Sequence, residues 1–145
     1  MALLVQPSDL NTAIYQDVLD EITRADATLI TRAIVAAIQE AKMYLSRYDL
    51  LQLFGTDTTD PTVIDGYLKY LVVDLAAWQI IKLASPNIDY NHLRVCYEDA
   101  VASLKMIQSG KANPEDWPYA DTTGETAPQG DSVAYSSNPK RCNYF

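Results

Sequence analysis

The stretch between Pro61 and Leu83 constrains the fold more than any other part of the sequence. Its apolar residues recur at helical spacing and fall on two neighbouring faces. They are Ile64, Leu68, Leu71, Leu75 and Trp78 on one face, and Val72, Ala76, Ile80 and Leu83 on the next. A helix that is apolar over so wide an arc must be covered on several sides. The sequence therefore predicts a central bundle helix. Asp60 and Pro61 mark its expected start, and Gly66 indicates close packing or a later effective start.

Three further segments have the spacing of helices that pack around this one. Ser8 is the expected N-cap of residues 8–22, which form one helix or two short ones, and Asp26 is the expected N-cap of the next helix. Asp89 is the expected N-cap of the last helix, and Gly110 its left-handed C-terminal cap. The apolar stripe of the second of these helices comprises Ile30, Ile34, Ile38, Ala41, Leu45 and Tyr48. The expected fold is all-α, a compact bundle of about four to five helices.

The composition changes near Gly110. Four of the seven prolines follow it, with many Ser and Thr and few aliphatic residues. Such a segment buries too little apolar surface to fold alone. We expect a helical bundle at residues 1–111 and an extended C-terminal arm at 112–145. The end of the arm combines a basic pair with aromatic residues, which favours docking to a partner over a tail without a role. The expected docking residues are Tyr135, Pro139, Lys140, Arg141, Tyr144 and Phe145.

The net charge of −8 excludes several kinds of partner. A nucleic-acid-binding surface needs clustered Lys and Arg, and an anionic membrane attracts basic segments. No stretch approaches the ~18 apolar residues of a membrane span, and the first residues lack the basic region of a signal peptide. The only two cysteines, Cys96 and Cys142, do not indicate a disulfide framework. We expect synthesis in the cytoplasm and no contact with membranes.

The sequence carries few residues suited to catalysis. His92 is the only histidine, and no nucleophile is predicted beside it. Asp57 and Asp60 lack the spacing and the late Glu of a calcium loop, so a turn and a helix cap explain them better. No glycine-rich phosphate loop is present. We therefore expect no enzyme activity, no catalytic residues, no cofactor and no metal.

Tyrosine is unusually frequent, with ten residues in the chain. Tyr44 and Tyr48 are four residues apart, and Tyr67 and Tyr70 three, so each pair shares one helix face. Tyrosine is common both at core edges and at protein interfaces. We take these four as candidate subunit-interface residues, with the core interpretation equally open.

Several segments resemble the family of Mu-like phage connector proteins, which are similar to the helical adaptor or head-completion proteins of tailed bacteriophages. The opening matches are "SDL" (Ser8–Leu10) and "EITRAD" (Glu21–Asp26). A long helix follows with "AIVAAIQEAKMYLSRYDL" (Ala33–Leu50), and then "YLKYLVVDLAAWQI" (Tyr67–Ile80), which resembles the central helix of the family with its embedded Asp, here Asp74.

The closing stretch "RVCYEDAVASLKMIQSGK" (Arg94–Lys111) is also similar to that of the family. Its matching positions are Tyr97, Ala100, Leu104, Ile107 and Gly110. The resemblance covers residues 7–111 and rests on packing patterns. The loop at Gly55–Pro61 lacks the proline-rich apolar turn of the family, and the arm is longer.

The resemblance implies a structural subunit of the virion neck, assembled in the host cytoplasm. It implies a homo-oligomeric ring of about twelve copies on the portal protein, built on a head-to-tail interface. The ring would extend the DNA channel, through which DNA passes without specific binding, and would meet a tail or stopper protein. The arm would hold the subunit on the portal. The alternatives are a non-phage helical protein–protein interaction module with a docking tail, and an enzyme with an unrecognised site.

Overall fold

The computed structural model describes residues 4–82 and 91–120. Within these ranges the regular secondary structure is helical. The elements are η1 (Pro7–Thr12), a 3-10 helix, and the α-helices α1 (Gln16–Thr23), α2 (Ala27–Tyr44), α3 (Leu50–Phe54), α4 (Gly66–Ile81) and α5 (Asn91–Gln108). The predicted all-α class is confirmed. The arm beyond residue 120 lies outside the described residues.

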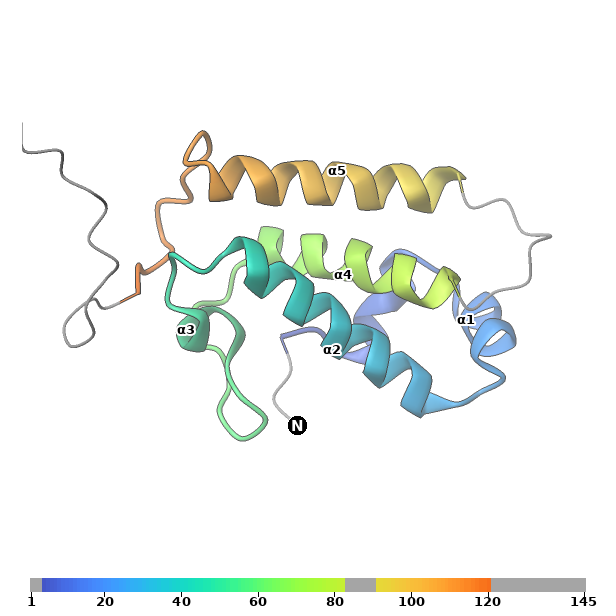
Figure 1. Cartoon of the computed structure of the whole chain (residues 1–145). Coiled ribbons are helices and arrows are strands. Elements are labelled where there is room, and N and C mark those ends of the chain that lie inside the picture. The colour runs from blue at the N-terminus through green and yellow to red at the C-terminus, as the bar shows by residue number, and fades with distance from the viewer. Residues whose placement is uncertain (1–3, 83–90, 121–145) are drawn as a thin grey trace, which may run out of the picture.

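Helix α4 occupies the middle of the bundle, as predicted. Figure 1 shows α5 running along one side of α4, with α2 crossing on another side and η1 and α1 at one end. More than half of the residues of α4 are buried. They are Leu68, Leu71, Val72, Val73, Leu75, Ala76, Ala77, Ile80 and Ile81. This coverage follows from the wide apolar arc, which no single neighbouring helix can hide.

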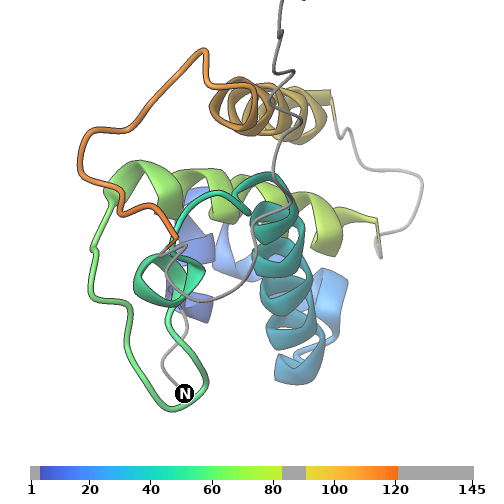
Figure 2. The same cartoon turned by 60° about the vertical axis from the view of Figure 1, so that its left-hand side comes forward.

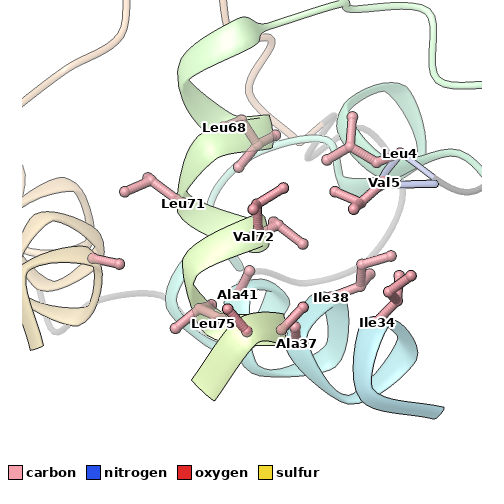
Figure 3. Packing of buried hydrophobic residues seen from close by; sticks show 14 of the residues in the cluster. Leu4, Val5, Ile34, Ala37, Ile38, Ala41, Leu68, Leu71, Val72 and Leu75 are labelled. Carbon is pink, nitrogen blue, oxygen red and sulfur yellow. The ribbon is translucent and has the colours of Figure 1, made fainter. Parts of the chain in front are cut away.

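The core between α4 and α2 is built from aliphatic and small residues. In Figure 3, Leu68, Val72 and Leu75 of α4 lie towards α2 and the N-terminal segment. The α2 side of the contact is formed by Ile34, Ala37, Ile38 and Ala41, and Leu4 and Val5 lie beside it. Fully burying one Leu, Ile or Val side chain contributes about 1.5–3 kcal/mol. The alanines allow the two helices to approach closely.

The start expected at Asp60 and Pro61 was wrong, because α4 begins at Gly66; the later start that Gly66 also indicated is the one observed. The amides of Thr62 and Val63 both donate to the carbonyl of Gln52, at 3.0 and 3.1 Å, which ties this backbone to α3. Asp65 is the N-cap instead. Ile64, expected on the buried face, is consequently 92% exposed.

The first segment forms two short helices, one of the two outcomes expected. Ser8 is not the cap, because η1 begins one residue before it. The N-cap is Gln6, whose amide donates to Asp9 Oδ2 at 2.8 Å. Asp26 caps α2 as predicted, accepting from the amide of Thr28 at 2.9 Å. The residues of the predicted apolar stripe are buried, but α2 ends at Tyr44, so Leu45 and Tyr48 lie beyond the helix.

Helix α3 was not predicted. Asp49 caps it by accepting from the amides of Leu51 and Gln52, and Leu53 and Phe54 bury its inner side. Gly55 ends the helix with a positive φ of 68°. A Cβ at Gly55 would lie 2.4 Å from the carbonyl oxygen of Thr59, so only glycine fits this turn.

Helix α5 ends as the sequence predicts. Gly110 has a φ of 77°, and its amide donates to the carbonyl of Ile107 while that of Lys111 donates to Met106. This pair of hydrogen bonds is the Schellman arrangement that glycine favours at helix ends. Among the described helices, none is long and apolar enough to cross a membrane.

Candidate interaction surface

Residues 112–120, the first part of the predicted arm, pack against the bundle. We call this segment the strap. Figure 2 shows it (orange) running from the end of α5 past the first turn of α4 towards α3. Trp117 is its anchor, with a side chain that is only 3% exposed. The ordered contacts of the bundle therefore extend beyond residue 111.

A single carboxylate joins the strap to the central helix. The indole Nε1 of Trp117 donates to Asp65 Oδ2 at 2.8 Å. The other oxygen, Asp65 Oδ1, accepts from the amide of Leu68 at 2.8 Å. Asp65 thus caps α4 and fixes Trp117 at once, which couples the two elements through one side chain.

Tyr48 lies beneath the strap and is 1% exposed. Its ring meets that of Trp117 edge-on, with centroids 5.4 Å apart, and stacks on Tyr119 at 5.2 Å. The amide of Asp49 donates to the carbonyl of Pro118 at 2.8 Å beside this stack. Burial raises the pKa of Tyr48, and the neighbouring Tyr119 adds to the effect. Tyr48 was a candidate interface residue; as packed here it belongs to the interior of the protein, because the strap covers it.

The other candidate tyrosines differ in exposure. Tyr44 is half-buried at the end of α2. Tyr67 and Tyr70, on the first turns of α4, are 55% and 65% exposed. Ile64 lies two residues before the first residue of α4 and is 92% exposed. We call the exposed side chains of Ile64, Tyr67 and Tyr70 the Tyr67 row. It lies where α4 emerges from under the strap.

Two hollows flank the Tyr67 row. The first has a volume of about 240 Å³ and is lined by Asp9, Thr12, Gly66, Lys69, Tyr70 and Val73. At its edge Lys69 Nζ pairs with Asp9 Oδ2 at 2.9 Å, which links η1 to α4. The second, about 370 Å³, is the strap groove, between α4, α5 and the strap. Its lining comprises Asp65, Tyr67, Ser103, Met106, Ile107, Ala112, Asn113, Pro114, Glu115 and Asp116.

A polar seam holds α2, α4 and α5 together away from these hollows. The hydroxyl of Tyr97 donates to Glu40 Oε1 at 2.8 Å, and Gln79 Nε2 donates to Glu40 Oε2 at 3.2 Å. The Tyr97 ring stacks on Trp78 with centroids 5.6 Å apart. Burial, aided by the hydrogen bond to Glu40, raises the pKa of Tyr97 to about 12. The seam fixes the angle at which α5 lies on the rest of the bundle.

His92 lies on the exposed side of α5, where its Nε2 is 3.8 Å from the Sγ of Cys96. Burial raises the pKa of the Cys96 thiol, and the nearby Asp74 adds to this, so the thiol keeps its proton at neutral pH. Burial also raises the pKa of Asp74, which His92 partly offsets. Within residues 4–82 and 91–120, no group of three or more His, Cys, Asp or Glu side chains is placed to hold a metal ion.

The expected docking residues Tyr135, Pro139, Lys140, Arg141, Tyr144 and Phe145 lie outside the described residues. Asp89, the expected cap of α5, does so as well. The residues that the sequence did not predict are Trp117 and Asp65. A tryptophan between Pro114 and Pro118, in a stretch poor in aliphatic residues, is the signal that could have indicated an anchor.

Comparison with known proteins finds no match: no family model, no curated protein and no solved structure is similar to this chain. The resemblance to the connector family therefore stays an expectation that rests on packing motifs. The functional argument depends on the surface of the molecule itself.

Proposed function

We propose that the protein is a structural adaptor subunit of the head–tail connector of a tailed bacteriophage. In this proposal, about twelve copies form a ring on the portal protein, joined by head-to-tail contacts. The ring extends the DNA channel in the virion neck and offers a platform to the tail or to a stopper protein. Its action is geometric, and the proposal assigns it no catalytic step.

The observation that carries the proposal is the Tyr67 row. A chain of 145 residues has a large surface for its volume, yet it exposes Ile64, Tyr67 and Tyr70 together at the start of its most buried helix. Aromatic residues are enriched where proteins meet, and grouped exposed apolar side chains mark interaction sites. The row is rigidly held, because Asp65 fixes the helix end that presents it.

The charge of the chain supports the same role. A net charge of −8 gives the surface a predominantly negative potential. A channel wall of that sign would let DNA slide past without tight binding. The proposed DNA contact is therefore one of passage and not of recognition.

Native mass spectrometry and negative-stain electron microscopy of the purified protein, alone and with the portal protein of the same genome, test the proposal. We expect rings of fixed stoichiometry. Replacing Tyr67 and Tyr70 together with Ser should abolish them. Tyr15→Ser is the control, because Tyr15 is 82% exposed and is the N-cap of α1, at another part of the surface.

Two results would contradict the proposal. One is a protein that stays monomeric at high concentration and does not bind the portal protein. This outcome would favour the helical interaction module with a docking tail. The other is a ring that survives the double substitution while far-UV circular dichroism shows an unchanged fold. In that case the row is not the interface.

A further inference from the structure

The strap groove combines negative charge with exposed apolar surface. Three carboxylates line it, from Asp65, Glu115 and Asp116, and no Lys, Arg or His is among its described lining residues. Met106 and Tyr67 expose apolar surface in the same hollow. Glu115 and Asp116 are exposed, and neither forms an ion pair within the described residues. A ligand that suits this groove has positive charge next to aromatic or aliphatic groups.

The arm of the same chain contains a segment with that chemistry. Lys140 and Arg141 are the only adjacent basic residues in a sequence with a net charge of −8, and Tyr144 and Phe145 follow within four residues. We propose that, in the free subunit, the strap groove binds the segment Pro139–Phe145 of the same chain. The basic pair meets Glu115 and Asp116, and an aromatic ring covers Met106.

The length of the chain allows this contact. The strap ends at the same end of the bundle as the groove, where the amide of Ala120 donates to the carbonyl of Arg47 at 3.1 Å. Residues 121–138 can span at most about 60 Å. This reach is longer than the path from Ala120 back to residues 113–116 of the same strap. A segment tethered this closely has an effective concentration in the millimolar range. Even weak charge pairing then suffices to hold it.

One consequence rests on the proposed function. A segment bound in its own groove is not available to the portal, so docking to the portal would require its release. The groove would thus keep the arm of an unassembled subunit folded back. The contact itself does not depend on a portal and is tested on the purified protein alone.

Cys142 offers a natural site for the test, because it lies within the proposed ligand segment. A nitroxide label is attached to Cys142 in full-length protein carrying Cys96→Ser, and the amide signals are recorded by NMR. We expect the signals of Ser103, Met106 and Asn113 to lose most of their intensity. Those of α1, at the other end of the molecule in Figures 1 and 2, should keep theirs.

Charge reversal supplies the matched controls. Lys140→Glu with Arg141→Glu should restore the groove signals, and so should Glu115→Lys with Asp116→Lys. Combining all four changes should bring the broadening back, since the pairing is then re-formed with opposite signs. Raising the ionic strength to about 1 M should weaken it.

Three results would overturn the inference. The first is an absence of broadening at the groove in the parent protein. The second is broadening that charge reversal does not change. The third is broadening that appears only between copies, in a mixture of isotope-labelled and nitroxide-labelled protein, because the occupant would then be a second molecule. Although Tyr67 lines the groove as well, ring formation is tested by the double substitution of Tyr67 and Tyr70, and the folded-back arm by charge reversal at Lys140, Arg141, Glu115 and Asp116, so the failure of one proposal is distinguishable from the failure of the other.

Discussion

Replacing Trp117 with Ala should destabilise the whole bundle, although Trp117 lies outside every helix. The side chain is 3% exposed, and a tryptophan buries roughly 200 Å². At about 25 cal/mol per Å², the lost apolar burial is about 5 kcal/mol. Measured losses for such truncations are about 3–5 kcal/mol. We expect a value near 3 kcal/mol, because the strap can detach and regain conformational entropy, which limits the loss.

Trp117→Phe separates the two contributions of this side chain. Phenylalanine keeps most of the ring against Tyr48 and removes the donor to Asp65 Oδ2. Losing a hydrogen bond to a charged acceptor costs about 1.5–3 kcal/mol when it is well buried. Since water can reach this half-buried carboxylate, we expect a loss of about 1–2 kcal/mol. The loss for Phe should therefore be clearly smaller than that for Ala.

Urea unfolding followed by far-UV circular dichroism measures both variants. Trp78, the other tryptophan, remains as a fluorescent probe of the contact between α4 and α5. Coincident transitions by the two methods would justify a two-state analysis. If Trp117→Ala lowers the free energy of unfolding by less than about 1 kcal/mol, the strap does not stabilise the bundle and the reasoning is refuted.

Three other perturbations follow from the structure. Gly55→Ala should destabilise the fold by at least about 2 kcal/mol, because the added Cβ would lie 2.4 Å from a backbone oxygen and φ is 68°. Gly66→Ala should instead stabilise the fold by roughly 0.5–1 kcal/mol, because a Cβ there meets nothing within 4 Å. Thermal unfolding measures both variants, and equal effects of the two would contradict this reasoning. Ultraviolet titration should find a tyrosine with a pKa of about 12, and replacing Glu40 with Gln should lower that pKa only in part, because burial is the larger cause. Because the folded pKa of Tyr97 is raised, its contribution to stability is present below pH ~10 and is lost as the pH rises through ~12. Asp74→Asn should raise the melting temperature at neutral pH, because burial disfavours the charged carboxylate and raises the pKa of Asp74. The gain should become smaller at acidic pH, where the wild-type carboxyl is protonated. A gain that does not change with pH would argue against the burial of Asp74.

Periodicity predicted the parts of the fold that are governed by repeated local signals. Asp26 and the apolar stripe that follows it predicted α2, and the wide apolar arc predicted the central position of α4. Gly110 gave the end of α5. In each case several residues at regular spacing indicate the same helix, so a single misleading residue has little weight.

The start of α4 was left open between Pro61 and a later start that Gly66 indicated, and the later start is the observed one. Asp60 and Pro61 form a good local helix start, but the backbone after them is held by Gln52 of α3. That competing contact is tertiary, and α3 itself is too short at five residues to show a period. The preference of one dipeptide was therefore overridden by packing that the local sequence does not encode.

The interaction surface was predicted only in part. The sequence paired Tyr44 with Tyr48 and Tyr67 with Tyr70, but helix spacing alone does not say which pair faces water. Tyr48 is covered by the strap, which arrives about 70 residues later in the chain. A contact at that separation leaves no periodic signal, and the strap has a composition that resembles a linker.

The absence of a polar face on α4 has a consequence for the chain before it is complete. A polypeptide that ends after α4 has α2 to cover one side of that helix, but the side that α5 protects is bare. Leu71, which is buried in the finished molecule and points towards α5 in Figure 3, then belongs to an apolar surface that other unfinished chains can share. Fragments that stop between α4 and α5 should therefore self-associate on release through this side of α4. During synthesis, the chain should therefore be most prone to aggregation after α4 has been made and before α5 can pack against it.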